Sequence, residues 1–543
     1  MHHLLSKSWK NVCWYGMAIL AFTVVGFAIY YPVLSGKFVI DDYGEIVLNK
    51  RVHTIKNIPT FFTGGTFFDG DPESPAGVYF RPIKMVWYAA IYTIFGPDPH
   101  YYHLFQIALH IGNTSLLFFV FLTALPYVVA FVMATIFLVH PLNVEAVAYI
   151  AAVQDPMFFG MGMSGLLYIL TQNQVRLREI GILILIFIIG LLTKETMLVF
   201  GAIYLVVIYL KSRRYIVPAA VGMFASFIIY TSYRCGVIHL CKTGVDYSPL
   251  GHLPFLKYLA QMPLILFFYI KSFFYPSRLL ISQHWYMESV TISSFYIPLL
   301  IDFIFFGILT IVLFMLYYRE STGRRAPTRM YTVYFWICVA GIFFHSHMLP
   351  LDFTVADQWF YVPMAGLLGM IGVILTEFIS GSKRNVWLVI FSIVTVALAF
   401  RSMHRVYMWR DQRDLFMHDY RYNKDSYDLV NNVGYVLVQE DRNDEALKFF
   451  IRETKLAPDY PVGWVNAGVL YELKGDLDTA EKYYERATET GNHYSAYKRY
   501  LLLLMKRKKY REAKSLLENK ILQYFPKDKQ FRENYNIVQE ALR

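Results

Sequence analysis

The chain has 543 residues, of which 56% are hydrophobic, 18% are aromatic and 17% are charged. Soluble globular proteins carry about 25% charged residues, so this composition excludes both a single soluble domain and a disordered chain. The net charge of +11 does not indicate nucleic-acid binding, because the basic residues of the polar C-terminal part are interleaved with acidic ones.

The charges are distributed unevenly along the chain. Residues 401–543 contain 26 of the 51 Lys and Arg residues and 22 of the 40 Asp and Glu residues. The remainder is poor in charge, as expected of a chain inside a membrane, whereas the last part has the composition of a soluble domain. We therefore predict an all-α protein with a polytopic transmembrane domain over 1–402 and a soluble domain over 403–543.

Many apolar stretches of the first part are long enough to cross a bilayer core of about 30 Å as helices. The segment 254–275 is also apolar, but Pro254, Lys257, Pro263 and Lys271 interrupt it, so we expect it to lie along the membrane surface. We predict eleven crossings, near 12–34, 104–123, 126–139, 157–170, 180–193, 196–210, 215–233, 293–318, 330–349, 359–379 and 386–402.

Basic loops predict the orientation of these crossings. Lys and Arg residues cluster at 176–178, 211–214, 324–329 and 383–384, and the positive-inside rule places such loops in the cytoplasm. With eleven crossings, the C-terminal domain then lies on the opposite side, together with the long first loop over 36–103. Most acidic residues of the membrane part fall on that same non-cytoplasmic side.

The C-terminal domain contains an internal repeat. Ala446, Ala480 and Ala513 recur at spacings of 34 and 33 residues, and Gly434 recurs as Gly468. Small residues at a 34-residue period are typical of tetratricopeptide repeats, in which two helices of each pair pack closely. About three repeats are the minimum for a stable stack, and such stacks bind extended peptides on a concave face.

Two adjacent acids, Asp41 and Asp42, follow the first crossing in SGKFVIDDYGEIVLNK. Carboxylates at a membrane boundary are energetically expensive and often functional. Such a group can act as a general base on a hydroxyl if a neighbouring charge keeps it ionised. The alternative interpretation is a solvated helix cap.

Further polar residues gather in the predicted outer loops. In LLTKETMLVF, Lys194 and Glu195 lie at a break between two apolar runs, where a cation could hold a lipid phosphate or simply form an interfacial pair. Histidines such as His103 also occur near these loops, but a lone histidine is more often a hydrogen-bonded core residue than a ligand. Together these residues indicate a membrane enzyme that acts on a polypeptide. The candidates besides the acidic pair are Arg81, His103, His140, Glu145, Asp155, Lys194, Glu195 and Tyr361.

Six strings in this order, followed by tetratricopeptide repeats, resemble the transmembrane and tetratricopeptide-repeat-containing O-mannosyltransferases of the GT-C class. The strings are FVIDDYGEIVLNKRV, YFRPI, YYHLFQIALH, HPLNVEAVAYI, LLTKET and ADQWFYVP. The resemblance covers most of the chain. It implies a dolichyl- or undecaprenyl-phosphate sugar as donor, a Ser or Thr hydroxyl of an exported protein as acceptor, and inversion at the anomeric carbon.

The resemblance also implies roles for single residues. Asp41 would be the general base, with Asp42 as its neighbour or a substrate contact, and Arg81 with Lys194 would hold the donor phosphate. The family implies no certain cofactor, although outer acids could bind a divalent metal through oxygen ligands. The cavity would be lined by His103, His140, Glu145, Asp155 and Glu195.

Two glutamines depart from the family pattern. Gln154 stands in AAVQD and Gln358 in ADQWFYVP, where the family carries arginine. The loss of two cations predicts a different donor, a displaced arginine or an inactive relative. Two alternatives therefore stay open: a membrane-anchored tetratricopeptide scaffold with a vestigial cavity, and a glycosyltransferase acting on a glycolipid or polysaccharide. Because the repeat array is short, we expect a bacterial or archaeal cytoplasmic membrane, with the lumenal side of the endoplasmic reticulum as the alternative.

Overall fold

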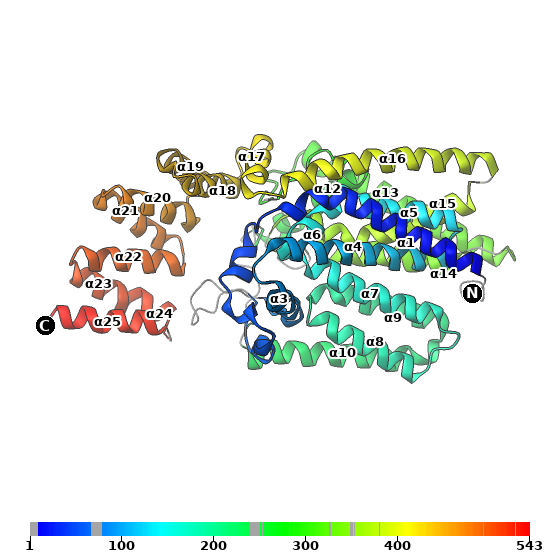
Figure 1. The fold of residues 1–543 in the computed structure, drawn as a ribbon, viewed down its shortest axis with the longest axis horizontal. Helices are drawn as coiled ribbons and strands as arrows, with labels where there is room; N and C mark the ends of the chain where they lie inside the picture. The colour runs from blue at the N-terminus through cyan, green and yellow to red at the C-terminus, as the bar shows by residue number, and fades with distance from the viewer. Residues whose placement is uncertain are drawn as a thin grey trace. The chain divides into compact units, whose positions relative to one another are not determined.

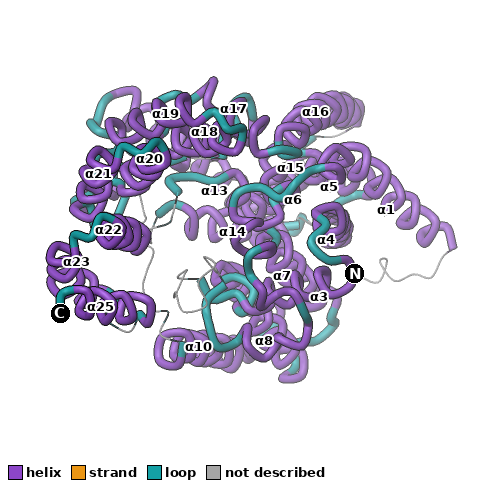
Figure 2. Tube along the Cα trace, turned by 60° about the vertical axis from the view of Figure 1, so that its left-hand side comes forward, coloured by secondary structure: helices purple, strands orange, loops and turns teal. Residues whose placement is uncertain are grey.

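The computed structural model describes residues 9–66, 79–238, 240, 250–251, 253–281, 283–324, 327–347, 351, 353–379, 381–491, 493–526 and 528–543. Every regular element within these ranges is a helix (Figures 1 and 2), which confirms the all-α prediction. The described residues form two compact units, and the chain passes from the first to the second between Asp411 and Gln412. The last helix of the first unit extends past residue 402 to Met408, which moves this boundary beyond the expected one.

The first unit consists of helices whose long members run roughly parallel in Figure 1. These apolar segments form helices because a backbone exposed to lipid must satisfy its own hydrogen bonds, as a helix does within one segment. The helices are α1 (Trp9–Tyr30), α2 (Ile58–Phe61), α3 (Pro82–Phe95), α4 (Pro99–Leu122), α5 (Tyr127–Val139), α6 (Val144–Ala148), α7 (Gln154–Thr171), α8 (Leu177–Leu191), α9 (Leu198–Lys211), α10 (Ile216–Ser232), α11 (Phe255–Leu259), α12 (Met262–Phe274), α13 (Ile297–Ser321), α14 (Thr328–His345), α15 (Tyr361–Glu377) and α16 (Gly381–Met408).

Six helical segments among the described residues are long and apolar enough to cross a membrane. A seventh crossing results if α5 and the bent segment Pro141–Ala148, at an angle of 51°, form one span. Helices α7, α8, α9 and α14 lie where we expected further crossings, but α8 and α9 have only 15 and 14 residues. The count of eleven therefore stays a prediction. The six segments are Val12–Ser35, Pro99–Leu122, Arg213–Val237, Ile292–Ser321, Asp357–Glu377 and Gly381–Met408.

Helices α14 and α15 approach each other closely at Gly366. A Cβ atom on Gly366 would lie 2.5 Å from the main-chain oxygen of Tyr334 and 2.5 Å from the main-chain nitrogen of Cys338. Both neighbours belong to the backbone of α14, so a side chain fits here only if the two helices separate.

We expect Gly366→Ala to destabilise the protein by on the order of 1–3 kcal/mol, because it overpacks a backbone contact. The melting temperature in detergent measures this loss. Gly112→Ala in α4 is the matched control, since a Cβ there meets no atom within 4 Å and alanine favours the helix. Equal melting temperatures for the two variants would contradict the proposed contact.

The second unit is a stack of helical hairpins. The pairs α18–α19, α20–α21 and α22–α23 follow the predicted period, and the alanines of the pattern at 446, 480 and 513 are fully buried. The helices are α17 (Gln412–Tyr422), α18 (Tyr427–Gln439), α19 (Asn443–Leu456), α20 (Pro461–Leu473), α21 (Leu477–Glu489), α22 (Tyr494–Lys506), α23 (Tyr510–Leu516), α24 (Leu522–Tyr524) and α25 (Lys529–Ala541).

The repeating glycines explain the close packing within each hairpin. A Cβ on Gly434 would lie 2.6 Å from the ring of Phe450, and a Cβ on Gly468 would lie 2.6 Å from the ring of Tyr484. The two contacts are equivalent, because each glycine faces an aromatic residue at the same position of the next helix. The tetratricopeptide prediction is therefore confirmed at the level of packing.

Candidate active site

The loop that carries the acidic pair follows α1 and a 3₁₀ turn, Tyr31–Ser35. Ile40 adopts a φ of 53° immediately before Asp41. This left-handed conformation is unfavourable for a β-branched residue by about 1–3 kcal/mol, and such strain clusters at functional sites. The fold therefore holds the start of the acidic pair in a conformation that the local sequence does not prefer.

Asp42 serves as the anchor of this loop. It is fully buried, and its two carboxylate oxygens accept hydrogen bonds from the main-chain N–H groups of Val39 (2.9 Å) and Ala151 (2.8 Å). The second bond ties the loop to the turn after α6. Because both oxygens accept hydrogen bonds from the backbone, Asp42 holds the loop in place.

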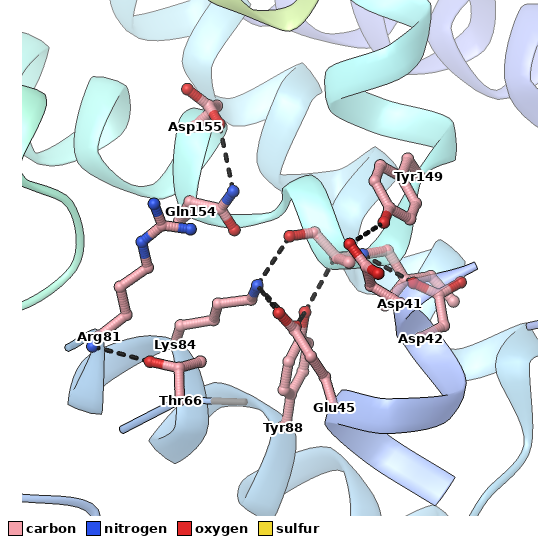
Figure 3. Close-up of polar contacts among 12 residues, drawn as sticks. Asp41, Asp42, Glu45, Thr66, Arg81, Lys84, Tyr88, Tyr149, Gln154 and Asp155 are labelled. Atoms are coloured by element: carbon pink, nitrogen blue, oxygen red, sulfur yellow. Dashed lines mark hydrogen bonds and ion pairs between the residues drawn. The ribbon is translucent and has the colours of Figure 1, made fainter. Parts of the chain in front are cut away.

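Asp41 has the more open carboxylate of the pair. It is half-buried, and its Oδ2 accepts a hydrogen bond of 2.7 Å from the hydroxyl of Tyr149. No other hydrogen bond to Asp41 occurs within the described ranges, which leaves Oδ1 available (Figure 3). Burial raises the pKa of Asp41, while the Tyr149 hydroxyl and the charge of Lys84 oppose this rise. A carboxylate with a raised pKa and an open oxygen is suited to accept a proton.

A buried ion pair lies beside the acidic loop. Lys84 Nζ lies 2.6 Å from Oε2 of Glu45 and donates to the carbonyl oxygen of Ala151 (2.8 Å), and Tyr88 donates to Glu45 (3.1 Å). Burial lowers the pKa of Lys84, and Glu45 opposes that change. Sequence analysis missed Lys84, which lies in the first turn of α3, three residues after Arg81.

Arg81 is a cation without an ion pair among the described residues. Its guanidinium lies 4.2 Å from the ring centroid of Tyr79, and its buried Nε has no hydrogen-bond partner. The main-chain N–H of Arg81 donates to the hydroxyl of Thr66 (2.9 Å), which fixes the start of α3. In Figure 3 the guanidinium points toward Gln154. An unpaired, half-buried guanidinium is an anion-binding group.

Lys194, the other predicted phosphate ligand, already has an anionic partner. Its Nζ lies 2.6 Å from Oδ1 of Asp155, and both side chains are buried. Gln154 donates to Oδ2 of the same aspartate at 3.4 Å. Burial lowers the pKa of Lys194, and the charge of Asp155 opposes this. A donor phosphate would therefore have to share Lys194 with Asp155, whereas Arg81 needs no such exchange.

Glu195 belongs to a separate ion pair. Its Oε1 accepts from Arg234 (2.8 Å) and from the hydroxyl of Tyr230 (3.1 Å). These contacts join the turn before α9 to the end of α10. They give Glu195 a structural role in the unit.

Glu145 lies in α6 and contacts the turn that precedes α15. It is buried, and its Oε2 accepts from the main-chain N–H of Gln358 at 3.2 Å. The positive charge of Arg405, a buried residue of α16 that sequence analysis missed, interacts with this carboxylate. The side-chain oxygens of Gln154 and Gln358 are buried without hydrogen-bond partners among the described residues, so each glutamine presents an acceptor at a position where the resemblance implied arginine.

Two further predicted residues hold helices together. His140 Nε2 lies 3.0 Å from the carbonyl oxygen of Phe273, and its Nδ1 accepts from the N–H of Leu142 at 3.2 Å. The hydroxyl of Tyr361 lies 2.6 Å from Nδ1 of His110. With these polar atoms engaged inside the helix bundle, the geometry favours a structural role for both residues.

His103 differs from these residues. It is fully buried in α4, and its electrostatic partners include the backbone of Lys37, in the loop that carries the acidic pair. Among the described residues, no group of three His, Cys, Asp or Glu side chains is arranged to hold a metal ion.

The comparisons with known proteins cover most of the chain. It is 23% identical to the mouse protein O-mannosyl-transferase TMTC3 over 84% of its length, and 24% identical to the human protein of that name over 85%. The fruit-fly protein O-mannosyl-transferase Tmtc1 is 30% identical over 32% of this chain and 20% of its own length. A tetratricopeptide repeat family model matches residues 463–490. The predicted resemblance is confirmed.

The chain spans about half the length of the mouse and human relatives, 53% of each. The apolar helices together with these relatives identify it as a membrane protein. These relatives come from animals, so they give no support to the bacterial or archaeal location that the short repeat array led us to expect.

Proposed function

We propose that the chain is a membrane glycosyltransferase that moves a sugar from a polyprenyl-phosphate donor to a Ser or Thr hydroxyl of an exported polypeptide. The observation that carries the proposal is the open carboxylate of Asp41 on a strained loop, with the unpaired cation Arg81 in the same cluster. The relatives, which are named protein O-mannosyl-transferases, support the same reaction class.

The proposed reaction is one displacement with inversion. The acceptor oxygen attacks the anomeric carbon and forms the new glycosidic bond, while the bond from that carbon to the donor phosphate breaks. Asp41 accepts the proton of the acceptor hydroxyl. The lipid phosphate leaves with the bonding electron pair, and its negative charge is stabilised by Arg81 and by the neighbouring Lys84 and Lys194. Since the leaving group is already anionic, it needs cations more than a proton.

Several features support a site on the non-cytoplasmic side. Cys235 is disulfide-bonded, as is typical of an oxidising compartment. The turn that contains Cys235 packs against the first loop, because the hydroxyl of Tyr233 donates to the carbonyl oxygen of Phe62 at 2.9 Å. Asp411, the last residue of the membrane unit, lies 2.7 Å from Lys37 of the loop that carries the acidic pair. The membrane unit thus ends beside the loop that carries the candidate base.

The proposal is tested with the full chain in nanodiscs, polyprenyl-phosphate mannose as donor and a Ser/Thr-rich peptide as acceptor. Mass spectrometry is expected to find a hexose on Ser or Thr. Transfer to a glycolipid and not to peptide would instead favour the polysaccharide alternative. Binding of peptide without any transfer would overturn the enzyme assignment in favour of the scaffold.

Arg81→Gln is expected to raise the KM for the donor by about 10- to 100-fold, because a charge-assisted hydrogen bond contributes about 1.5–3 kcal/mol. The donor KM of Arg81→Lys should lie between those of the wild type and Arg81→Gln, since lysine keeps the charge and loses the fork geometry. Initial rates against donor concentration measure the effect. Arg176→Gln, at an exposed arginine in the loop before α8, is the control. An unchanged donor KM in Arg81→Gln would remove Arg81 from the phosphate site.

A further inference from the structure

The candidate base is held by one side chain from a distant part of the chain. The hydroxyl of Tyr149 donates to Oδ2 of Asp41 at 2.7 Å. Tyr149 lies in the turn after α6, and only 8% of it is exposed. Asp41 is also influenced by the charges of Lys84, Asp42 and Glu45, but these groups form no hydrogen bond with it in the described residues. Tyr149 therefore determines how the carboxylate is turned.

Tyr149 is in turn held by the end of the last membrane helix. Its ring stacks on the ring of Trp409, with centroids 5.3 Å apart and planes at 26°. Trp409 is fully buried, and the guanidinium of Arg405 lies 5.7 Å from its ring centroid on the same helix end. A tyrosine side chain has two main torsions, so a stacked neighbour that fixes the ring plane also limits where the hydroxyl can point.

The segment that contains Trp409 is attached to the loop that contains Asp41. The main-chain N–H of Lys37 donates to the carbonyl oxygen of Arg410 at 2.9 Å, and Lys37 Nζ forms the ion pair with Asp411. A Cβ on Gly36 would lie 3.3 Å from that carbonyl oxygen, so the two backbones are in direct contact. Trp409 stacks on Tyr149, Tyr149 donates to Asp41, and the loop that contains Asp41 is bonded to the segment that contains Trp409. The three residues therefore fix one another's positions.

We propose that Tyr149, oriented by the stacked ring of Trp409, positions the carboxylate of Asp41 so that its free oxygen faces the acceptor hydroxyl. This inference rests on the proposed function. It makes Tyr149 and Trp409 positioning residues at the point where the chain leaves the membrane unit for the repeat unit. If Tyr149 and Trp409 are purely structural, their substitution lowers only the stability of the protein. If they position Asp41, their substitution also changes the pKa of Asp41 and the turnover of the enzyme.

Full-chain variants in nanodiscs separate these roles. For Tyr149→Phe, loss of the hydrogen bond to the charged carboxylate should move the acid limb of the kcat/KM profile to higher pH by about one unit, with the donor KM unchanged. Trp409→Leu should lower kcat about tenfold or more, and Trp409→Phe, which keeps an aromatic face, should restore part of it. The controls are Tyr43→Phe and Trp387→Leu, both at exposed positions.

An acid limb that does not move in Tyr149→Phe would overturn the inference, as would equal losses of kcat in the leucine and phenylalanine variants at Trp409. If the wild-type chain transfers no sugar, the proposed function fails, and the positioning is then tested without activity. In an Asp41→Cys background, the pH midpoint of thiol alkylation by iodoacetamide should rise when Tyr149→Phe is added, because the hydroxyl no longer stabilises the thiolate. An unchanged midpoint would refute the contact itself.

Discussion

Asp41→Asn is expected to lower sugar transfer by about 10²- to 10⁴-fold, the usual contribution of a general base. Asparagine has nearly the same size and its oxygen can still accept the hydrogen bond from Tyr149, so the loop should keep its conformation. It cannot, however, take up the proton of the acceptor hydroxyl. The rate of hexose incorporation into peptide, with the melting temperature as a check of folding, measures the effect.

The pH dependence of the wild-type reaction follows from the same group. Burial raises the pKa of Asp41 and thereby disfavours its charged form. The base works only when ionised, so transfer should fall as the pH drops through this raised pKa.

Asp98→Asn is the matched control for Asp41→Asn, because Asp98 is an exposed N-cap of α4 and asparagine is an equally good cap. Full activity in Asp41→Asn would show that the base is elsewhere.

Lys84→Met is expected to destabilise the membrane unit by about 3–5 kcal/mol, because it leaves the carboxylate of Glu45 buried without its cation. The lost bond to the carbonyl oxygen of Ala151 adds to this. Thermal unfolding in detergent measures the loss. Adding Glu45→Gln should recover part of the stability, since the neutral amide removes the unpaired charge.

An exposed ion pair provides the control for Lys84→Met. Lys514 and Glu518 lie 3.8 Å apart in the repeat unit with side chains 40% and 42% exposed. Lys514→Met should therefore change stability by less than about 1 kcal/mol. If Lys84→Met were equally mild, or if Glu45→Gln gave no recovery, the buried pair would not be the element that supports the acidic loop.

Local patterns in the sequence were sufficient for the helices and the repeats. Runs of apolar residues predict membrane helices because each residue contributes its own transfer free energy, whatever its neighbours in space. The 34-residue spacing of Gly434 and Gly468 predicts the hairpin stack, because each hairpin needs a small residue at the same close approach. The ordered motifs likewise indicated the relatives that the comparisons found.

The tertiary structure alone showed how the surroundings of the site residues differ. Asp41 and Asp42 are chemically identical neighbours, but Asp42 accepts from the N–H of Ala151, over a hundred positions along the chain, while Asp41 accepts from the hydroxyl of Tyr149. In the same way, pairing with Asp155 sets Lys194 apart from Arg81. Burial, ion pairing and hydrogen bonding depend on which distant segments meet. A residue's type and spacing along the chain therefore indicate that it can do chemistry, while its partners in space decide whether it does.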